Sequence, residues 1–110
     1  MPTPDDFRCI ALSFRGAEEK SHMAHPDFRV GGRIFATLGR PDAGWGMVGL
    51  LPEQQEDFML LSDAFTPAAG AWGRSGSTLV RLDSVPHDLL EAALAAAWRK
   101  RAPAKLQADS

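Results

Sequence analysis

The spacing of hydrophobic positions divides the chain into segments with a helical period and segments that alternate like strands. Three helices are expected: Thr3 to about Arg15, Pro52 to about Leu61, and a last one opened by Ser84–Pro86 and closed by Arg99–Arg101. The first begins with a Thr-Pro-Asp-Asp capping sequence, and apolar residues then recur at i, i+3, i+4 and i+7: Phe7, Ile10, Ala11 and Phe14. The last carries a wide apolar stripe: Leu89, Leu90, Ala93, Leu94, Ala97 and Trp98. Such a stripe favours docking on a sheet.

Residues Phe28–Leu38 are expected to form a β-hairpin, because two glycines, Gly31 and Gly32, interrupt an alternating pattern and suit a two-residue turn. This turn predicts the cross-strand pairs Val30 with Arg33, Arg29 with Ile34, and Phe28 with Phe35. Arg29 and Arg33 would then point to opposite faces of the sheet. A short apolar strand is expected next, at Trp45–Leu50.

A second hairpin is expected over Gly70–Leu82, with Ser75-Gly76 as its turn. The alternation then places four residues on an outer face: Trp72, Arg74, Leu79 and Arg81. In this register Trp72 faces Leu79 and Arg74 faces Ser77. The opposite face is expected to be core: Thr78, Val80 and Leu82. The two hairpins together suggest a binding surface with arginines beside aromatic rings.

The remaining segments are interpreted as connections within one domain that spans residues 1–110. Gly16–Pro26 is polar and is expected to be irregular, while Gly39–Gly44 and Ser62–Ala71 are expected to be loops. The chain after about Pro103 is expected to be a frayed tail.

The composition of the chain bears on nucleic-acid binding, on disulfide formation and on membrane contact. The chain has 14 acidic and 12 basic residues and a formal net charge of −2, whereas proteins that bind nucleic acid non-specifically are more often basic. The single cysteine, Cys9, cannot form an internal disulfide and is expected to be a small packing residue of the first helix. No signal peptide and no long apolar run is apparent, so a cytoplasmic protein without membrane contact is expected.

Four motifs taken together resemble the MmcQ/YjbR family of small bacterial proteins: HPDFRVGGRIFATL, GWGMVGLLPEQQ, GAWGRSGSTLVRL and LAAAWRKRAPAK. The resemblance extends from the first helix to about Lys105. It implies an α+β fold similar to the bacterial frataxin CyaY, with an antiparallel sheet built from two hairpins plus a central strand and packed against three helices. Members are commonly labelled DNA-binding because the hairpins form a double wing. The second arm of this chain departs from the pattern, since Ser77 and Leu79 stand where relatives are often basic or aromatic.

The similarity to frataxins also raises metal binding, because frataxins hold iron on an acidic ridge. Here the nearby acids are few and are interrupted by Arg8 and Arg15: Asp5, Asp6, Glu18 and Glu19. A zinc site from Glu18, His22 and His25 is a weaker possibility, and a turn-forming role is expected for both histidines. No metal and no cofactor is therefore expected.

The candidate binding residues are the cations and the indole of the two hairpins: Arg29, Arg33, Trp72, Arg74 and Arg81. Arginine can hold phosphates and an indole can stack on a base, so the leading hypothesis is a non-enzymatic DNA-binding protein with two hairpin wings. The alternative is a module that binds a small anionic ligand or a protein partner in the groove between the hairpins. An enzyme is least favoured, because no nucleophile–base–acid set is evident.

Overall fold

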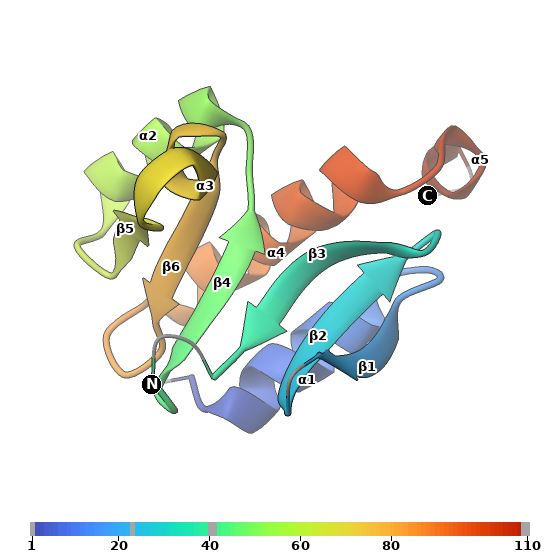
Figure 1. The fold of residues 1–110 in the computed structure, drawn as a ribbon, viewed down its shortest axis with the longest axis horizontal. Coiled ribbons are helices and arrows are strands. Elements are labelled where there is room, and N and C mark those ends of the chain that lie inside the picture. Colours follow the sequence, from blue (N-terminus) through green and yellow to red (C-terminus); the bar gives the residue numbers. More distant parts are fainter. Residues whose placement is uncertain (1, 23, 40–41, 109–110) are drawn as a thin grey trace.

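The computed structural model describes residues 2–22, 24–39 and 42–108, and the chain forms one mixed α+β unit (Figure 1). Its helices are α1 (Pro4–Ser13), α2 (Pro52–Leu61), α3 (Gly70–Arg74), α4 (His87–Arg101) and α5 (Ala104–Ala108). Its strands are β1 (Glu18–His22), β2 (His25–Val30), β3 (Arg33–Leu38), β4 (Trp45–Gly49), β5 (Phe65–Pro67) and β6 (Ser77–Arg81).

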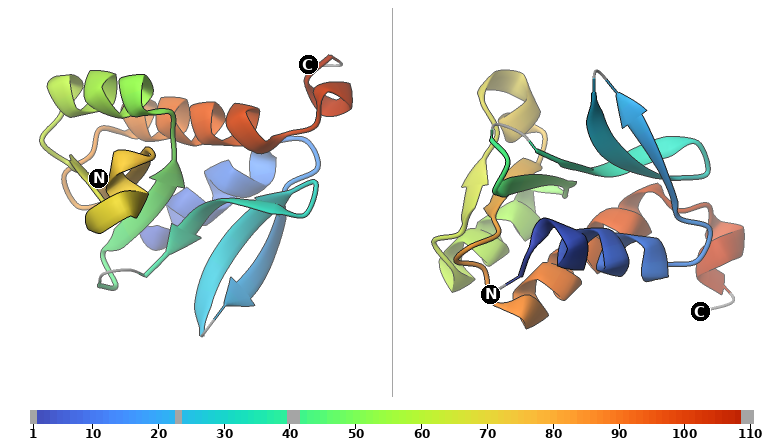
Figure 2. Two further views of the ribbon diagram at one scale, coloured as in Figure 1. Left: turned by 45° about the horizontal axis from the view of Figure 1, so that its top comes forward. Right: turned by 90° about the horizontal axis from the view of Figure 1, so that it is seen from below.

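The described strands form one antiparallel sheet in the order β1-β2-β3-β4-β6-β5. Helices α1 and α4 cover one face of this sheet, while α3 and the β1–β2 arm rise on the other side (Figure 2, right). The α+β fold with an antiparallel sheet is therefore confirmed. One face of the sheet is closed by helices, and the other is left partly open between α3 and the β1–β2 arm.

The core lies between the sheet and the two long helices. Phe7 of α1 is fully buried, and a Cβ placed on Gly46 of β4 would lie 2.6 Å from its ring, so a glycine is needed there. Trp98 of α4 stacks on Phe14 with ring centroids 5.9 Å apart and donates its indole N–H to the Arg15 carbonyl at 2.9 Å. The expected apolar stripes of both helices thus face the sheet.

The helix ends follow the sequence in part. Thr3 and Asp6 form the expected capping box, with N–H to oxygen distances of 2.8 and 3.1 Å. Helix α1 ends at Ser13, two residues before Arg15, and Gly16 follows with φ +73°.

The tail after Pro103 is not frayed as expected. It contains α5, which packs so closely that a Cβ on Gly16 would lie 2.8 Å from Leu106. The Gln107 amide donates to the carbonyls of Arg99 and Ala102 at 2.9 and 2.8 Å. These bonds satisfy two of the carbonyl groups that the end of α4 leaves open.

The first hairpin is confirmed, with a correction to its register. Gly31 and Gly32 both have positive φ, and the pairs Val30 with Arg33 and Arg29 with Ile34 form as expected. Phe28 pairs with Ala36 instead of Phe35, because a bulge shifts the register between Phe28 and Arg29. The bulge allows two successive residues of β3, Phe35 and Ala36, to be buried.

The second hairpin does not form. Its expected first arm is α3, so Trp72 does not face Leu79 and Arg74 does not face Ser77. Strand β6 pairs instead with β4 and with β5, a strand inside the segment expected to be a loop at Ser62–Ala71. The expected core face of this segment is confirmed, since its members are at most 1% exposed: Thr78, Val80 and Leu82.

Tertiary contacts explain why this segment forms a helix. The buried Gln55 of α2 places its amide nitrogen 3.1 Å from the carbonyl oxygens of Gly73 and Ser77 and from the Thr78 hydroxyl. A Cβ at Gly73 would collide with the Ala68 carbonyl, and one at Gly76 would collide with the Leu50 carbonyl. The glycines therefore provide close backbone packing and not a hairpin turn.

Two more expectations are corrected. The segment expected to be irregular contains the edge strand β1, whose Glu18 and Lys20 pair with Arg29 and Asp27. Its charged sequence lacks the alternation of a half-buried strand, and charged residues are a common feature of sheet edges.

Cys9 is exposed and is not a packing residue. Among the described residues, no helix has the length and apolar composition needed to cross a membrane.

Candidate functional site

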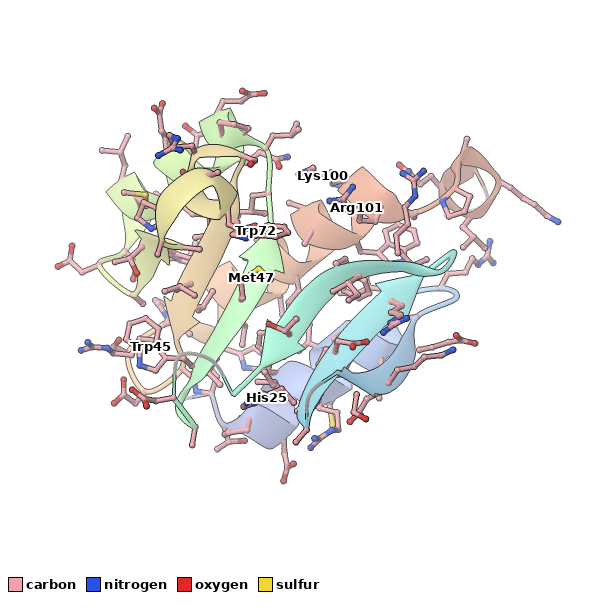
Figure 3. The ribbon with its side chains drawn as sticks, in the orientation of Figure 1. His25, Trp45, Met47, Trp72, Lys100 and Arg101 are labelled. Carbon is pink, nitrogen blue, oxygen red and sulfur yellow. The ribbon has the colours of Figure 1, made fainter. Side chains whose placement is uncertain are left out.

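A cavity of about 680 Å³ lies on the face of the sheet that α1 and α4 leave open. We call it the sheet-face cleft. Its lining includes residues from β2, β4, α3 and the end of α4: His25, Asp27, Arg29, Met47, Trp72 and Arg101. Figure 3 shows Trp72 and Met47 beside the upper half of β4, Arg101 to their right at the end of α4, and His25 near the lower end of β3. Elements distant in the sequence therefore converge on one hollow.

Arg29 is the cation of the cleft that an ion pair holds in place. Its Nε lies 2.8 Å from one carboxylate oxygen of Asp27, and an Nη lies 3.2 Å from the other. The Asp27 side chain is 1% exposed, whereas that of Arg29 is 27% exposed. Hydrogen bonds to Asp27 raise the pKa of Arg29 above its ordinary value. This two-point pairing fixes the guanidinium and also occupies both carboxylate oxygens.

Arg101, the last residue of α4, contributes to the lining of the cleft. In the sequence this residue is only part of a basic run at a helix end. Its Nε is buried and has no hydrogen-bond partner among the described residues. The neighbouring Lys100 donates to the Leu50 carbonyl at 3.0 Å, and burial, followed by the positive charge of Arg101, lowers its pKa.

Trp72 provides the aromatic wall. It lies on α3 and is 75% exposed although it is one of the largest apolar side chains. Gly70 starts this helix with φ +65°. At the other end, the Gln55 amide donates to the carbonyls of Gly73 and Ser77 and so fixes the end of the helix. An indole this exposed at the edge of a cavity can stack on a planar ligand.

The structure brings three of the five candidate residues together and separates the other two. Arg29, Arg33 and Trp72 line the sheet-face cleft, and Arg74 and Arg81 do not. The register expected to point Arg29 and Arg33 to opposite faces is observed, with Arg29 paired to Ile34 and Arg33 to Val30, yet both arginines contribute to the lining of the cleft.

Arg81 lies elsewhere on the sheet, where its guanidinium carbon is 4.9 Å from the centroid of the Trp45 ring. This distance is within the range of a cation–π contact. The outer face expected for Trp72, Arg74, Leu79 and Arg81 as a group therefore does not exist.

Outside the cleft, basic residues are partly paired with acids and are absent from one long stretch of the chain. Arg8 is held 2.9 Å from both Asp5 and Glu19, on the β1 side of the molecule. Residues 42–73, which include α2, contain five acids and no lysine or arginine. Duplex DNA binding usually depends on several cations that track the phosphates along one surface.

The described histidine side chains are not grouped with two or more other metal ligands. His22 and His25 pair across the β1–β2 turn, and the side chain of His22 lies outside the described residues. In the described part of the chain, no three histidine, cysteine or carboxylate side chains are placed to hold a metal ion. His25 lines the cleft, beside Gly39, where a Cβ would lie 3.1 Å from its Nδ1.

A second hollow, of about 670 Å³, lies between α1 and α4 and contrasts with the cleft. Its charged lining is acidic, with Asp6, Asp88 and Glu91, and its His87 is 2.9 Å from Glu91. Cys9 is also part of this lining. The hollow has no arginine, so it does not suit an anion.

Comparisons with known proteins show which family model and which solved structure the chain is similar to. The model of the YjbR family matches residues 12–100. The crystal structure of Deinococcus radiodurans protein DR2400, described as a DUF419 domain, is similar with a TM-score of 0.73 and 22% sequence identity. That similarity covers 89% of this chain and 77% of the other. No curated protein matches the sequence.

Proposed function

The chain belongs to the YjbR family, and we propose that this member binds a small organic anion with a planar ring in the sheet-face cleft. The family is the one that the sequence motifs resembled. The observation that carries the proposal is the convergence of Arg29, Arg33 and Trp72, from β2, β3 and α3, on one cavity. Its volume of about 680 Å³ falls within the usual range for small-molecule sites, about 300–1,000 Å³.

The lining matches the two parts of such a ligand. Arg29, fixed by Asp27, offers a guanidinium that needs little ordering when an anion binds. Trp72, together with Ile34 and Met47, offers an apolar surface for a ring. Covering the exposed indole would also remove apolar area from water.

DNA binding through two hairpin wings is the competing proposal. This proposal requires two hairpin wings, but the expected first arm of the second wing is the helix α3. In addition, Arg74 and Arg81 lie outside the cleft. The acidic stretch over residues 42–73 would also repel phosphates close to that arm. Catalysis is not part of our proposal, and a cytoplasmic location stays a prediction.

The proposal can be tested by nuclear magnetic resonance titration of the labelled protein. Phenyl phosphate and benzoate carry both a ring and a charge, phenol has only the ring, and inorganic phosphate and acetate have only the charge. We expect the first two to shift the indole signal of Trp72 and the side-chain signal of Arg29, and the three controls to shift them far less. No shift of cleft residues by either ring-bearing anion at millimolar concentration would overturn the proposal.

Two variants test whether the ligand binds in the sheet-face cleft. Trp72→Ala should weaken binding of phenyl phosphate about fivefold or more, since a stacking contact is worth roughly 1–3 kcal/mol. Leu60→Ala is the matched control, because Leu60 is 87% exposed and lies outside the cleft. In a parallel assay, duplex DNA that binds at micromolar protein and low salt, and binds more weakly to Arg74→Ala, would favour the DNA proposal instead.

A further inference from the structure

The cleft has an excess of positive charge that a single negative charge would not neutralise. Among the described residues, its charged lining consists of Asp27, Arg29, Arg33 and Arg101, a net charge of +2 with His25 taken as neutral. The one carboxylate is nearly fully buried, and both its oxygens are bonded to Arg29, so it does not offer a site for a ligand cation. Charges in such a partly enclosed site interact more strongly than in bulk water.

The cations reach this face from separate elements. Arg29 and Arg33 flank the turn of the β2–β3 hairpin, and Arg101 comes from the end of α4. In the described part of the chain, Asp27 forms its ion pair with Arg29, so the cleft contains both a fixed cation and cations without that partner. Each of these guanidinium groups can donate to an anionic group in the cleft.

Arg101 has an unpaired donor that an anionic ligand could bind. Its Nε is buried without a hydrogen-bond partner, and leaving a buried guanidinium nitrogen unpaired is unfavourable. A turn of the side chain into the cleft would give this nitrogen an acceptor if an anionic oxygen were present. The positive charge of Arg101 also disfavours the charged form of Lys100 beside it, and an anion would relieve that repulsion.

We propose that the cleft selects a dianionic group, the chemistry of a phosphate monoester, on a planar ring, and that Arg101 provides a second anion contact in addition to Arg29. This inference rests on the proposed function, since it names the class of anion that the same cleft takes. It adds a residue, Arg101, that the sequence did not single out as a binding residue.

The decisive comparison uses phenyl phosphate and phenyl sulfate, which share a ring and a tetrahedral group but differ in charge. The titration is done at about pH 8, above the second pKa of a phosphate monoester at about 6, so the phosphate is largely dianionic. We expect phenyl phosphate to bind about tenfold more tightly, because one further charge pair in this site is worth on the order of a factor of ten. Equal affinity, or tighter binding of phenyl sulfate, would overturn the inference and leave the proposed function standing. If neither compound binds, both fail.

Arg101→Gln tests the named residue, with Arg99→Gln as its control. Both substitutions remove one positive charge from the last turn of α4, but Arg99 does not line the cleft. We expect Arg101→Gln to reduce the preference for phosphate over sulfate to about twofold to threefold, and Arg99→Gln to preserve it. An unchanged preference in a folded Arg101→Gln protein would overturn the role of Arg101. If that variant does not fold, Arg101→Lys decides: it keeps the charge and should keep most of the preference, and its complete loss would contradict a charge-based contact.

Discussion

The segments 28–38 and 70–82 look alike in sequence but fold differently. Both contain glycines between alternating residues, yet the first is a hairpin and the second is a short helix followed by a strand. In the first, two adjacent glycines with positive φ are sufficient to close the turn, and a Cβ at Gly32 would meet no atom within 4 Å. In the second, Gly73 and Gly76 are packed against the backbone of other segments. A glycine in a sequence can thus indicate freedom of conformation, close packing or, as at Gly76, both, and only the surroundings show which.

Alanine at the two turns should separate these roles most clearly. Gly76→Ala should lower the free energy of unfolding by about 3 kcal/mol or more, because φ is +111° and the new Cβ would collide with the Leu50 carbonyl. Gly32→Ala should cost only about 1 kcal/mol, for its φ of +79°. Urea unfolding followed by circular dichroism measures both. Similar losses in the two variants would remove the proposed difference.

The next largest effect is expected at the residue that anchors the second segment. Gln55→Ala should lower the free energy of unfolding by about 2 kcal/mol, since it removes the buried amide bonds to the carbonyls of Gly73 and Ser77, which then keep only backbone N–H donors. Gln54→Ala is the control, because Gln54 binds an exposed helix-end N–H and should cost less than about 1 kcal/mol. If Gln55→Ala proved as mild as its control, the helix α3 would not depend on this contact.

The arginines of the two segments should differ in ligand binding. Arg33→Ala is expected to weaken binding of phenyl phosphate roughly fivefold, about 1 kcal/mol, because Arg33 lines the cleft. Arg74→Ala should change it less than about twofold, because Arg74 lies outside the cleft and acts only through screened long-range attraction. Isothermal titration calorimetry distinguishes these values. The reverse order would show that anions bind on the other side of α3.

The smallest expected effect concerns stability at Trp72. Since this side chain is 75% exposed, Trp72→Ala should change the free energy of unfolding by less than about 0.5 kcal/mol while it weakens ligand binding. Thermal unfolding with and without phenyl phosphate tests the separation. A large loss of stability in the absence of ligand would mean that Trp72 is part of the structural core of the second segment.

The candidate site was only partly visible in the sequence. Arg29, Arg33 and Trp72 stood out as cations and an aromatic ring near turns, and all three line the cleft. Arg101 was not recognised, because a basic residue at a helix end has a sufficient local explanation in the helix dipole. Asp27 was not recognised either, because its role depends on burial and on the pairing with Arg29.

The sequence by itself determined the capping box at Thr3, the apolar stripe of α4 and the Gly31-Gly32 turn, since each depends on residues close in the chain. The family resemblance followed from the same local motifs. Tertiary structure alone decided the edge strand β1, the helix α3, and the meeting of Arg101 with Arg29 and Trp72. These features depend on contacts between segments far apart in the sequence, whose free energies the local pattern does not contain.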